Sequence, residues 1–166
     1  MEGYRWKAAV VTLSDKGYAG EREDKSGPLL CEMITEAGYE VEETILLPDE
    51  QEEIEKYLCK LCDVDKLDVI FTTGGTGFSP RDCTPEATMA VAERNVPGIA
   101  EAMRAASLQV TSRAMLSRGV SVIRGKTLII NLPGSPKAVR ENLEAILPAL
   151  DHGLAILSGR DGECAR

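Results

Sequence analysis

The chain has 166 residues, a length typical of one domain, and 43% of them are hydrophobic, which excludes a disordered chain. Folding hides roughly 70% of the surface of a chain this long, so a core can form without disulfides or structural metals. The 19 basic residues against 27 acidic ones give a net charge of −8, which argues against nonspecific binding of nucleic acid.

Short β-branched segments alternate with amphipathic segments, which is typical of a parallel sheet with helices on both faces. The sequence therefore predicts an α/β fold, a three-layer α/β/α sandwich with a mostly parallel central sheet, in a single domain over residues 1–166. The predicted strands are Ala8–Leu13, Val41–Leu47, Asp68–Thr73, Val120–Ile123 and Thr127–Leu132, the last two forming a hairpin. The predicted helices are Ser26–Gly38, Glu50–Cys62, Thr84–Arg94, Pro97–Leu108 and Lys137–Leu157, the last with or without a break near Pro148.

Polar or glycine-rich segments follow four of these strands. They are Ser14-Asp15, Pro48-Asp49-Glu50, the run from Gly74 to Asp82, and the run from Asn131 to Lys137. In open α/β sheets, ligands bind outside the carboxyl ends of the strands. We therefore expect these four segments to converge on one site at one edge of the sheet.

The run Gly74-Gly75-Thr76-Gly77 at a strand end has two interpretations. Glycines allow successive backbone N–H groups to point into one concavity, which would form a phosphate cradle. The same run could be a simple tight turn. It has neither the dinucleotide-binding spacing nor the P-loop spacing, and Gly125-Lys126-Thr127 is interpreted as a hairpin turn.

Asp49 and Asp82 stand in two of the converging segments. Two carboxylates facing one phosphate cradle would suit Mg²⁺ held by one or two carboxylates together with substrate phosphates. Aspartate is also common in turns and helix caps, so both could be ordinary loop residues.

The remaining residues with metal or redox chemistry predict little function. The pair Cys59 and Cys62 falls at the end of a predicted helix, whereas an activated thiolate is typically found at a helix start, so we interpret the pair as packing. The single histidine, His152, excludes a His-rich metal centre and is expected at the surface or a helix end. An odd cysteine count that includes Cys164, with no apolar leader or membrane span, predicts reduced thiols and a cytoplasmic location.

Several motifs together resemble the molybdopterin adenylyltransferase family, which includes the bacterial MogA proteins and one domain of gephyrin. The resemblance covers nearly the whole chain and keeps the order of the family's motifs. The matching runs are Asp24–Pro28, Leu47–Glu50, Thr73–Gly77, Arg81–Ala87, Ala114–Arg118 and Asn131–Ala138.

The resemblance implies an enzyme that transfers AMP from ATP to the terminal phosphate of molybdopterin and releases pyrophosphate. It also implies a Mg²⁺ requirement, a homotrimer and a possible transient contact with a molybdate insertase. Asp49 and Asp82 are expected to carry catalysis and metal binding. The residues expected to bind the two substrates are Ser14, Asp15, Thr73, Gly74, Gly75, Thr76, Gly77, Arg81, Ser117, Arg118, Pro133, Gly134, Ser135 and Lys137.

Two other functions remain possible on the same sequence. MoaB-type relatives vary around the positions of Asp49 and Pro136, and a non-catalytic molybdopterin carrier would keep the glycine loop without requiring the aspartates. A nucleotide hydrolase would consume ATP without molybdopterin. The presence of both aspartates favours the adenylyltransferase interpretation.

Overall fold

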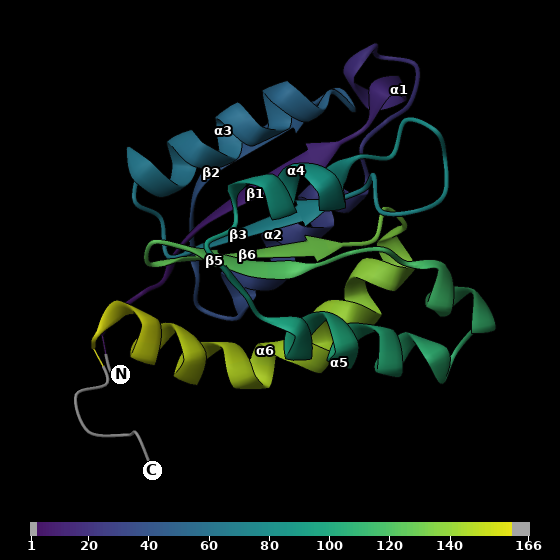
Figure 1. Cartoon of the computed structure of the whole chain (residues 1–166). Helices are drawn as coiled ribbons and strands as arrows, with labels where there is room; N and C mark the ends of the chain where they lie inside the picture. Colours follow the sequence, from purple (N-terminus) through teal and green to yellow (C-terminus); the bar gives the residue numbers. More distant parts are fainter. Residues whose placement is uncertain (1–2, 161–166) are drawn as a thin grey trace.

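The computed structural model describes residues 3–160 and contains one six-stranded sheet with helices on both faces (Figure 1). The strands are β1 (Lys7–Leu13), β2 (Glu40–Leu47), β3 (Val69–Thr73), β4 (Arg94–Asn95), β5 (Ser121–Arg124) and β6 (Thr127–Leu132). The helices are α1 (Asp15–Tyr18), α2 (Ser26–Glu36), α3 (Gln51–Asp63), α4 (Thr84–Val91), α5 (Pro97–Leu108), the 3₁₀ helix η1 (Ser112–Leu116) and α6 (Pro136–Ser158).

The strand order is β2-β1-β3-β6-β5-β4. The pairs β1–β2, β1–β3 and β3–β6 are parallel, whereas β5 is antiparallel to β6 and to β4. This confirms the mostly parallel sheet and the predicted hairpin, which β5 and β6 form. The chain leaves β1 toward one side of the sheet and leaves β3 toward the other, which opens a crevice between the two following loops.

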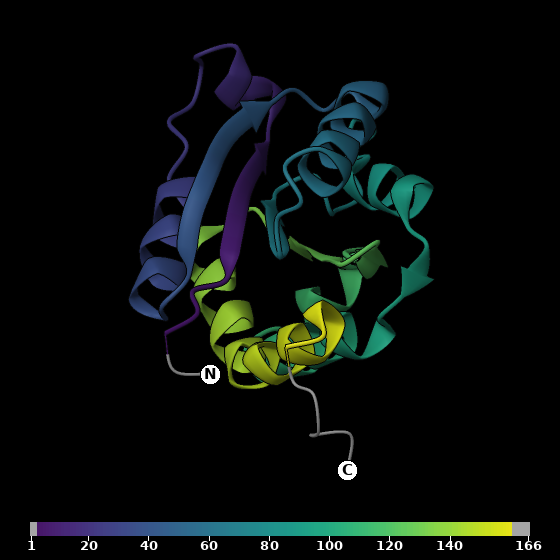
Figure 2. The same ribbon diagram turned by 90° about the vertical axis from the view of Figure 1, so that its left-hand side faces the viewer.

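The helices form two outer layers. In Figure 1, α3 and α4 lie above the sheet and α5 and α6 below it, and the view in Figure 2 shows α2 on the side of α6. Side chains alternate along β1: Ala8 and Val10 enter one core with α2, α5 and α6, whereas Ala9 and Val11 enter the other with α3 and α4. The three-layer prediction is confirmed.

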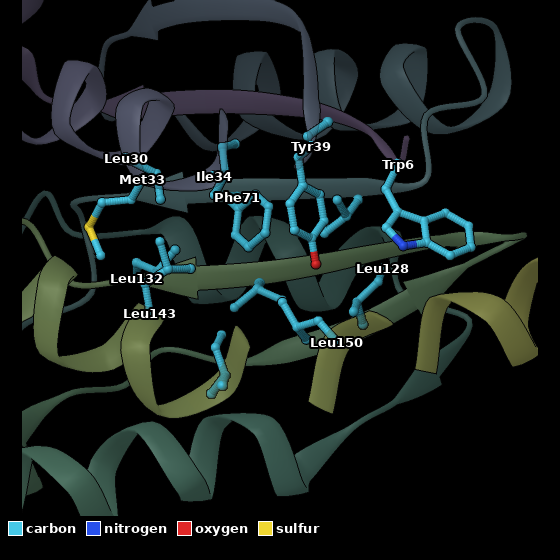
Figure 3. Packing of buried hydrophobic residues seen from close by; sticks show 14 of the residues in the cluster. Trp6, Leu30, Met33, Ile34, Tyr39, Phe71, Leu128, Leu132, Leu143 and Leu150 are labelled. Carbon is cyan, nitrogen blue, oxygen red and sulfur yellow. The ribbon is translucent and has the colours of Figure 1, made fainter. Parts of the chain in front are cut away.

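The larger core fixes α2 and α6 against the sheet (Figure 3). Phe71 of β3 is fully buried, and its ring meets that of Tyr39 edge to face at a centroid distance of 6.0 Å. Leu30 of α2 and Leu143 of α6 are fully buried around it. Burying each such side chain contributes about 1.5–3 kcal/mol, which holds the starts of both helices at the carboxyl edge of the sheet.

The helix predicted over Thr84–Arg94 is wrong at its end, because α4 stops at Val91. The backbone of Ala92 is extended, and the N–H of Glu93 donates to the carbonyl of Ile123 at 2.9 Å. The segment that follows pairs with β5 as the short strand β4. Pairing with an open sheet edge thus overrides the helical pattern of the sequence.

Helix α6 runs without a break through Pro148. A proline inside a helix removes one N–H donor and leaves the carbonyl four residues earlier, that of Glu144, without its usual partner. Pro148 and Glu144 are exposed, so water can satisfy that carbonyl, while Ile146 and Leu150 are buried on either side. Packing of the apolar face therefore keeps the helix continuous.

The part of the chain that the structure describes supports the packing interpretation of the cysteines. Cys62 is buried in the core beneath α3, and Cys59 packs against the same core. Burial raises the pKa of the Cys62 thiol to about 12, so the thiol stays protonated and unreactive.

Two other residues were singled out in the sequence, a further cysteine and the single histidine. Cys164 lies outside the described residues, and His152 lies exposed on α6. Within residues 3–160, no helix has the length and apolar character needed to cross a membrane.

Replacing Cys59 and Cys62 together with alanine is expected to leave turnover close to that of the unmodified chain. Stability should fall modestly, by about 1–2 kcal/mol, because buried sulfur contacts are deleted. Urea unfolding and a turnover assay measure the two effects. A large loss of activity in a folded double variant, or stoichiometric zinc in the purified chain, would contradict the packing interpretation.

Candidate active site

The four converging segments meet at one cavity at the carboxyl edge of β1, β2, β3 and β6, as the sequence predicted. The cavity has a volume of about 1010 Å³. Single small-molecule sites span roughly 300–1,000 Å³, so this cavity is at the upper end of that range. The helices α2 and α6 begin at its wall, and the N-terminal end of a helix carries partial positive charge.

The glycine loop is shaped by its neighbours. Gly74 and Gly75 have φ values of +97° and +68°, a region that favours glycine. A Cβ on Gly74 would strike the carbonyl oxygen of Leu13, and one on Gly75 would strike the hydroxyl of Thr84. That hydroxyl, fully buried, donates to the carbonyl of Gly74 at 2.9 Å. The loop is therefore a close-fitting backbone wall of the cavity.

Asp49 and Asp15 hold each other in place. The N–H of Asp15 donates to Oδ2 of Asp49 at 3.0 Å, and the N–H of Asp49 donates to Oδ1 of Asp15 at 2.9 Å. The other oxygen of Asp49, Oδ1, is buried and has no hydrogen-bond partner. Burial raises the pKa of the Asp49 carboxyl, and the nearby charges of Asp15 and Asp82 act in the same direction. An orphaned oxygen in this position is suited to a cation.

Asp82 lines the same cavity from the loop after β3. Its Oδ2 accepts from the N–H groups of Gly77 and Ser79, at 3.0 and 3.1 Å. No group of three or more metal-ligating side chains occurs in residues 3–160. Mg²⁺ does not require such a cage, because it commonly binds one or two carboxylates together with substrate phosphates. Asp49 and Asp82 fit that mode of binding.

Arg81 is a positively charged residue among those predicted to bind substrate. It lines the cavity, and its guanidinium already pairs with two carboxylates. Its guanidinium donates to both carboxylate oxygens of Asp15, at 2.9 and 3.2 Å, and to Glu50 at 2.7 Å. These hydrogen bonds raise the pKa of Arg81 and lower that of Asp15. Arg81 therefore joins the loops after β1, β2 and β3 across the mouth of the cavity.

Most predicted binding residues line the cavity, and their polar groups largely shape its loops. The hydroxyl of Ser14 accepts from Gly17 N–H, that of Ser135 accepts from Ala138 N–H, and that of Thr73 donates to the carbonyl of Pro133. The predicted residues on the cavity wall are Ser14, Asp15, Asp49, Thr73, Gly74, Gly75, Arg81, Asp82, Gly134 and Ser135.

The other predicted residues lie beside the cavity, outside its lining: Thr76, Gly77, Ser117, Arg118, Pro133 and Lys137. Thr76 is buried and its carbonyl accepts from the N–H of Arg118 at 2.8 Å. The hydroxyl of Ser117 accepts from Gly119 N–H at 3.3 Å. The ammonium group of Lys137 lies 3.9 Å from Glu141, and its side chain is 79% exposed. The structure thus separates two of the three predicted cations, Arg118 and Lys137, from the cavity lining.

The sequence interpretation assigned none of residues 16–25 to substrate binding, yet this stretch before α2 forms a wall of the site. Lys16, Arg22 and Lys25 line the cavity there, together with Ser26, whose hydroxyl donates to the carbonyl of Gly134 at 2.6 Å. The signal available in the sequence was the presence of three basic residues soon after the Ser14-Asp15 pair that follows β1. With Arg81 they give four cations, facing the five carboxylates of Asp15, Glu23, Asp24, Asp49 and Asp82.

The fold and this cavity define an α/β protein with a charged cavity at the carboxyl edge of its sheet. The family model described as "Probable molybdopterin binding domain" matches residues 9–152, and the chain belongs to this family. The resemblance found in the sequence is thereby confirmed.

Individual relatives agree with the family assignment. The chain is 47% identical over 146 residues to the molybdopterin adenylyltransferase of Escherichia coli (strain K12), covering 86% of this chain and 74% of that protein. It is 43% identical over 157 residues to the molybdopterin adenylyltransferase of Helicobacter pylori (strain J99), covering 90% and 86%. The crystal structure of the molybdopterin biosynthesis enzyme MoaB from Thermus thermophilus superposes with a TM-score of 0.88 at 49% identity, covering 93% and 97%.

Proposed function

We propose that this chain is a molybdopterin adenylyltransferase of molybdenum cofactor biosynthesis. An oxygen of the terminal phosphate of molybdopterin attacks the α-phosphorus of ATP, the bond from that phosphorus to the β-phosphate oxygen breaks, and pyrophosphate leaves. The observation that carries the proposal is the meeting of Asp49 and Asp82 at one cavity, with a buried carboxylate oxygen of Asp49 that lacks a partner. Curated relatives at 43–47% identity are named for this activity.

The side chains suit a reaction that needs positioning and charge stabilisation rather than a protein nucleophile. Asp49 and Asp82 would hold Mg²⁺, which when bound neutralises charge on the triphosphate and on the departing pyrophosphate. The five carboxylates of the cavity outnumber its four cations, so ATP needs such neutralisation to enter. Lys16, Arg22 and Lys25 supply local positive charge, and the backbone of Gly74 and Gly75 allows phosphate oxygens to approach closely.

The test is a turnover assay with the purified chain, ATP, Mg²⁺ and molybdopterin. We expect pyrophosphate release in a one-to-one ratio with adenylated molybdopterin, dependent on molybdopterin and abolished by a chelator. Binding of molybdopterin without pyrophosphate release would support the carrier function instead, which the 49% identity to a protein named MoaB makes worth measuring. Consumption of ATP without molybdopterin would indicate a hydrolase.

Ser117 is assigned to pterin binding by its motif, and this role stays a prediction because the residue lies beside the cavity. Ser117→Ala is expected to weaken molybdopterin binding while ATP binding and stability stay nearly unchanged. Titration with each ligand measures this, and the exposed Ser112 on η1 offers a matched control as Ser112→Ala. Equal molybdopterin affinity in the two variants would remove Ser117 from the site.

We propose a homotrimer, for which an exposed apolar patch gives support. Met103 is buried in the core and Ile99 packs against it, whereas Leu108, Val110, Met115 and Leu116 are 43–65% exposed around the end of α5 and η1. Light scattering at micromolar concentration is expected to give three times the chain mass of 17.9 kDa.

Charge introduced into this patch is expected to break the trimer, so Met115→Glu should scatter as a smaller species. Ile156→Glu is the control, since Ile156 is 52% exposed on α6 outside the patch. A monomer in the unmodified chain would contradict the assembly.

We also propose a cytoplasmic location and a transient contact with a molybdate insertase. The free thiols of the described cysteines support the cytoplasmic location.

A further inference from the structure

Arg118 holds the loop that carries Asp82, and its side chain lies outside the cavity lining. Its backbone N–H donates to the carbonyl of Thr76 at 2.8 Å, and its Nε donates to the carbonyl of Gly77 at 2.8 Å. Its Nη2 donates to the carbonyl of Asp82 at 3.0 Å. One residue therefore holds both ends of the Thr76–Asp82 segment.

The third guanidinium nitrogen of Arg118, Nη1, holds the guanidinium itself in place. Nη1 donates to both carboxylate oxygens of Glu86, at 2.9 and 2.7 Å, and these hydrogen bonds raise the pKa of Arg118. Glu86 lies in the first turn of α4, which is packed against the sheet. The positive charge of Arg118 is thus neutralised by Glu86, and the side chain does not line the cavity.

The Asp82 carboxylate depends on the loop that Arg118 holds. Oδ2 of Asp82 is oriented by the N–H groups of Gly77 and Ser79, both inside that loop. The carbonyl oxygen of Gly77 in turn accepts a hydrogen bond from Nε of Arg118. A shift of the loop would move the Asp82 main chain together with the two N–H groups that donate to its carboxylate. The second carboxylate oxygen of Asp82, Oδ1, would then point in another direction.

We infer that Arg118 is a positioning residue of the adenylyl-transfer site: it acts through Asp82 and does not bind substrate phosphate. This inference rests on the proposed function and revises the role that the motif suggested. The guanidinium makes four hydrogen bonds at once from three nitrogens held in a fixed planar fork, whereas a lysine has only three donors on a single nitrogen. The geometry of the side chain, rather than its charge, is what the loop requires.

The experiment compares Arg118→Gln and Arg118→Lys with Arg124→Gln. Arg124 is a matched control, because it donates to both oxygens of Asp63 and to the carbonyl of Val91 at the far end of α4. We expect both Arg118 variants to lose about 10–100-fold in kcat, the range typical of residues that orient a ligand group. KM for ATP and molybdopterin should change little, and Arg124→Gln should keep normal kcat.

A double-mutant cycle with Asp82→Asn separates positioning from general stabilisation. If Arg118 acts through Asp82, Arg118→Gln should lower kcat by less than about 3-fold when Asp82 is already asparagine. An equal loss in both backgrounds would overturn the inference. A raised KM with normal kcat, or full activity in Arg118→Lys, would overturn it as well and indicate a substrate-binding charge.

Amide hydrogen exchange gives a readout that does not depend on turnover. The N–H groups of Gly77 and Ser79 should exchange faster in Arg118→Gln than in the unmodified chain and in Arg124→Gln. Unchanged exchange would contradict the inference. A lack of turnover in the unmodified chain would overturn the proposed function, and the exchange comparison would still decide whether Arg118 fixes the Asp82 loop.

Discussion

Asp82→Asn is expected to lower the turnover of molybdopterin adenylylation by about 10²-fold or more, on the scale of losing one preorganised electrostatic contact. Asparagine keeps the shape of the side chain, and its carbonyl oxygen can still accept from Gly77 and Ser79. What disappears is the negative charge toward the cation and triphosphate. Molybdopterin affinity should therefore stay close to normal, which a ligand titration beside the turnover assay measures.

Asp49→Asn is expected to show the same pattern, because Asp49 approaches the cavity from the end of β2 with a buried oxygen that lacks a partner. If both carboxylates serve one metal–triphosphate complex, the loss in the double variant should be less than the product of the single losses. Asp63→Asn is the control, since Asp63 is paired with Arg124 away from the cavity.

Two outcomes would change the assignment. Turnover near normal in either single variant would exclude the shared metal. Weaker pterin binding with normal turnover at saturation would assign that aspartate to substrate recognition instead. The Mg²⁺ concentration that gives half-maximal turnover should rise in both single variants, and an unchanged value would count against the metal role.

Gly74→Ala is expected to impair both stability and activity. The φ of +97° is strained for any residue with a Cβ, and the added methyl would meet the backbone carbonyl of Leu13, which cannot rotate away. Strain of this kind costs about 1–3 kcal/mol, and relief requires the glycine loop to move relative to β1. Urea unfolding should show the stability loss, and turnover should fall at least 10-fold, on the scale of a misplaced reacting group.

Gly153→Ala provides the matched control. Gly153 lies in α6 with no atom within 4 Å of an added Cβ, so alanine there improves helix propensity by about 0.5–1 kcal/mol. The control should unfold at higher urea concentration and retain full turnover. Normal turnover in a folded Gly74→Ala variant would show that the glycine loop is an ordinary turn rather than part of the site.

The sequence predicted the arrangement of the sheet well because the relevant signals are local. Buried β-branched runs marked each main strand, and the first-turn proline of Thr84-Pro85-Glu86 marked the start of α4. Once four strands are parallel, their following loops must share one edge, so the meeting of Asp49 and Asp82 could be expected before any coordinates.

Side-chain partners distant in sequence could not be predicted in this way. Arg118 was expected at the cavity because it is a cation in a family motif, yet its direction is set by Glu86, 32 residues earlier. The mutual contact of Asp15 and Asp49 likewise spans 34 residues. Arg22 gives no periodic signal at all, and its position depends on how the chain between β1 and α2 packs.

The strand order has a consequence for folding. The cavity takes its walls from segments spread between Thr12 and Pro136, and β3 lies between β1 and β6, its parallel partners. Parallel pairing between distant segments is slow, because chain entropy is lost before contacts compensate for it. During synthesis, the ligand site therefore remains incomplete until β6 has left the ribosome and docked. A truncated chain that ends before β6 should therefore bind neither substrate.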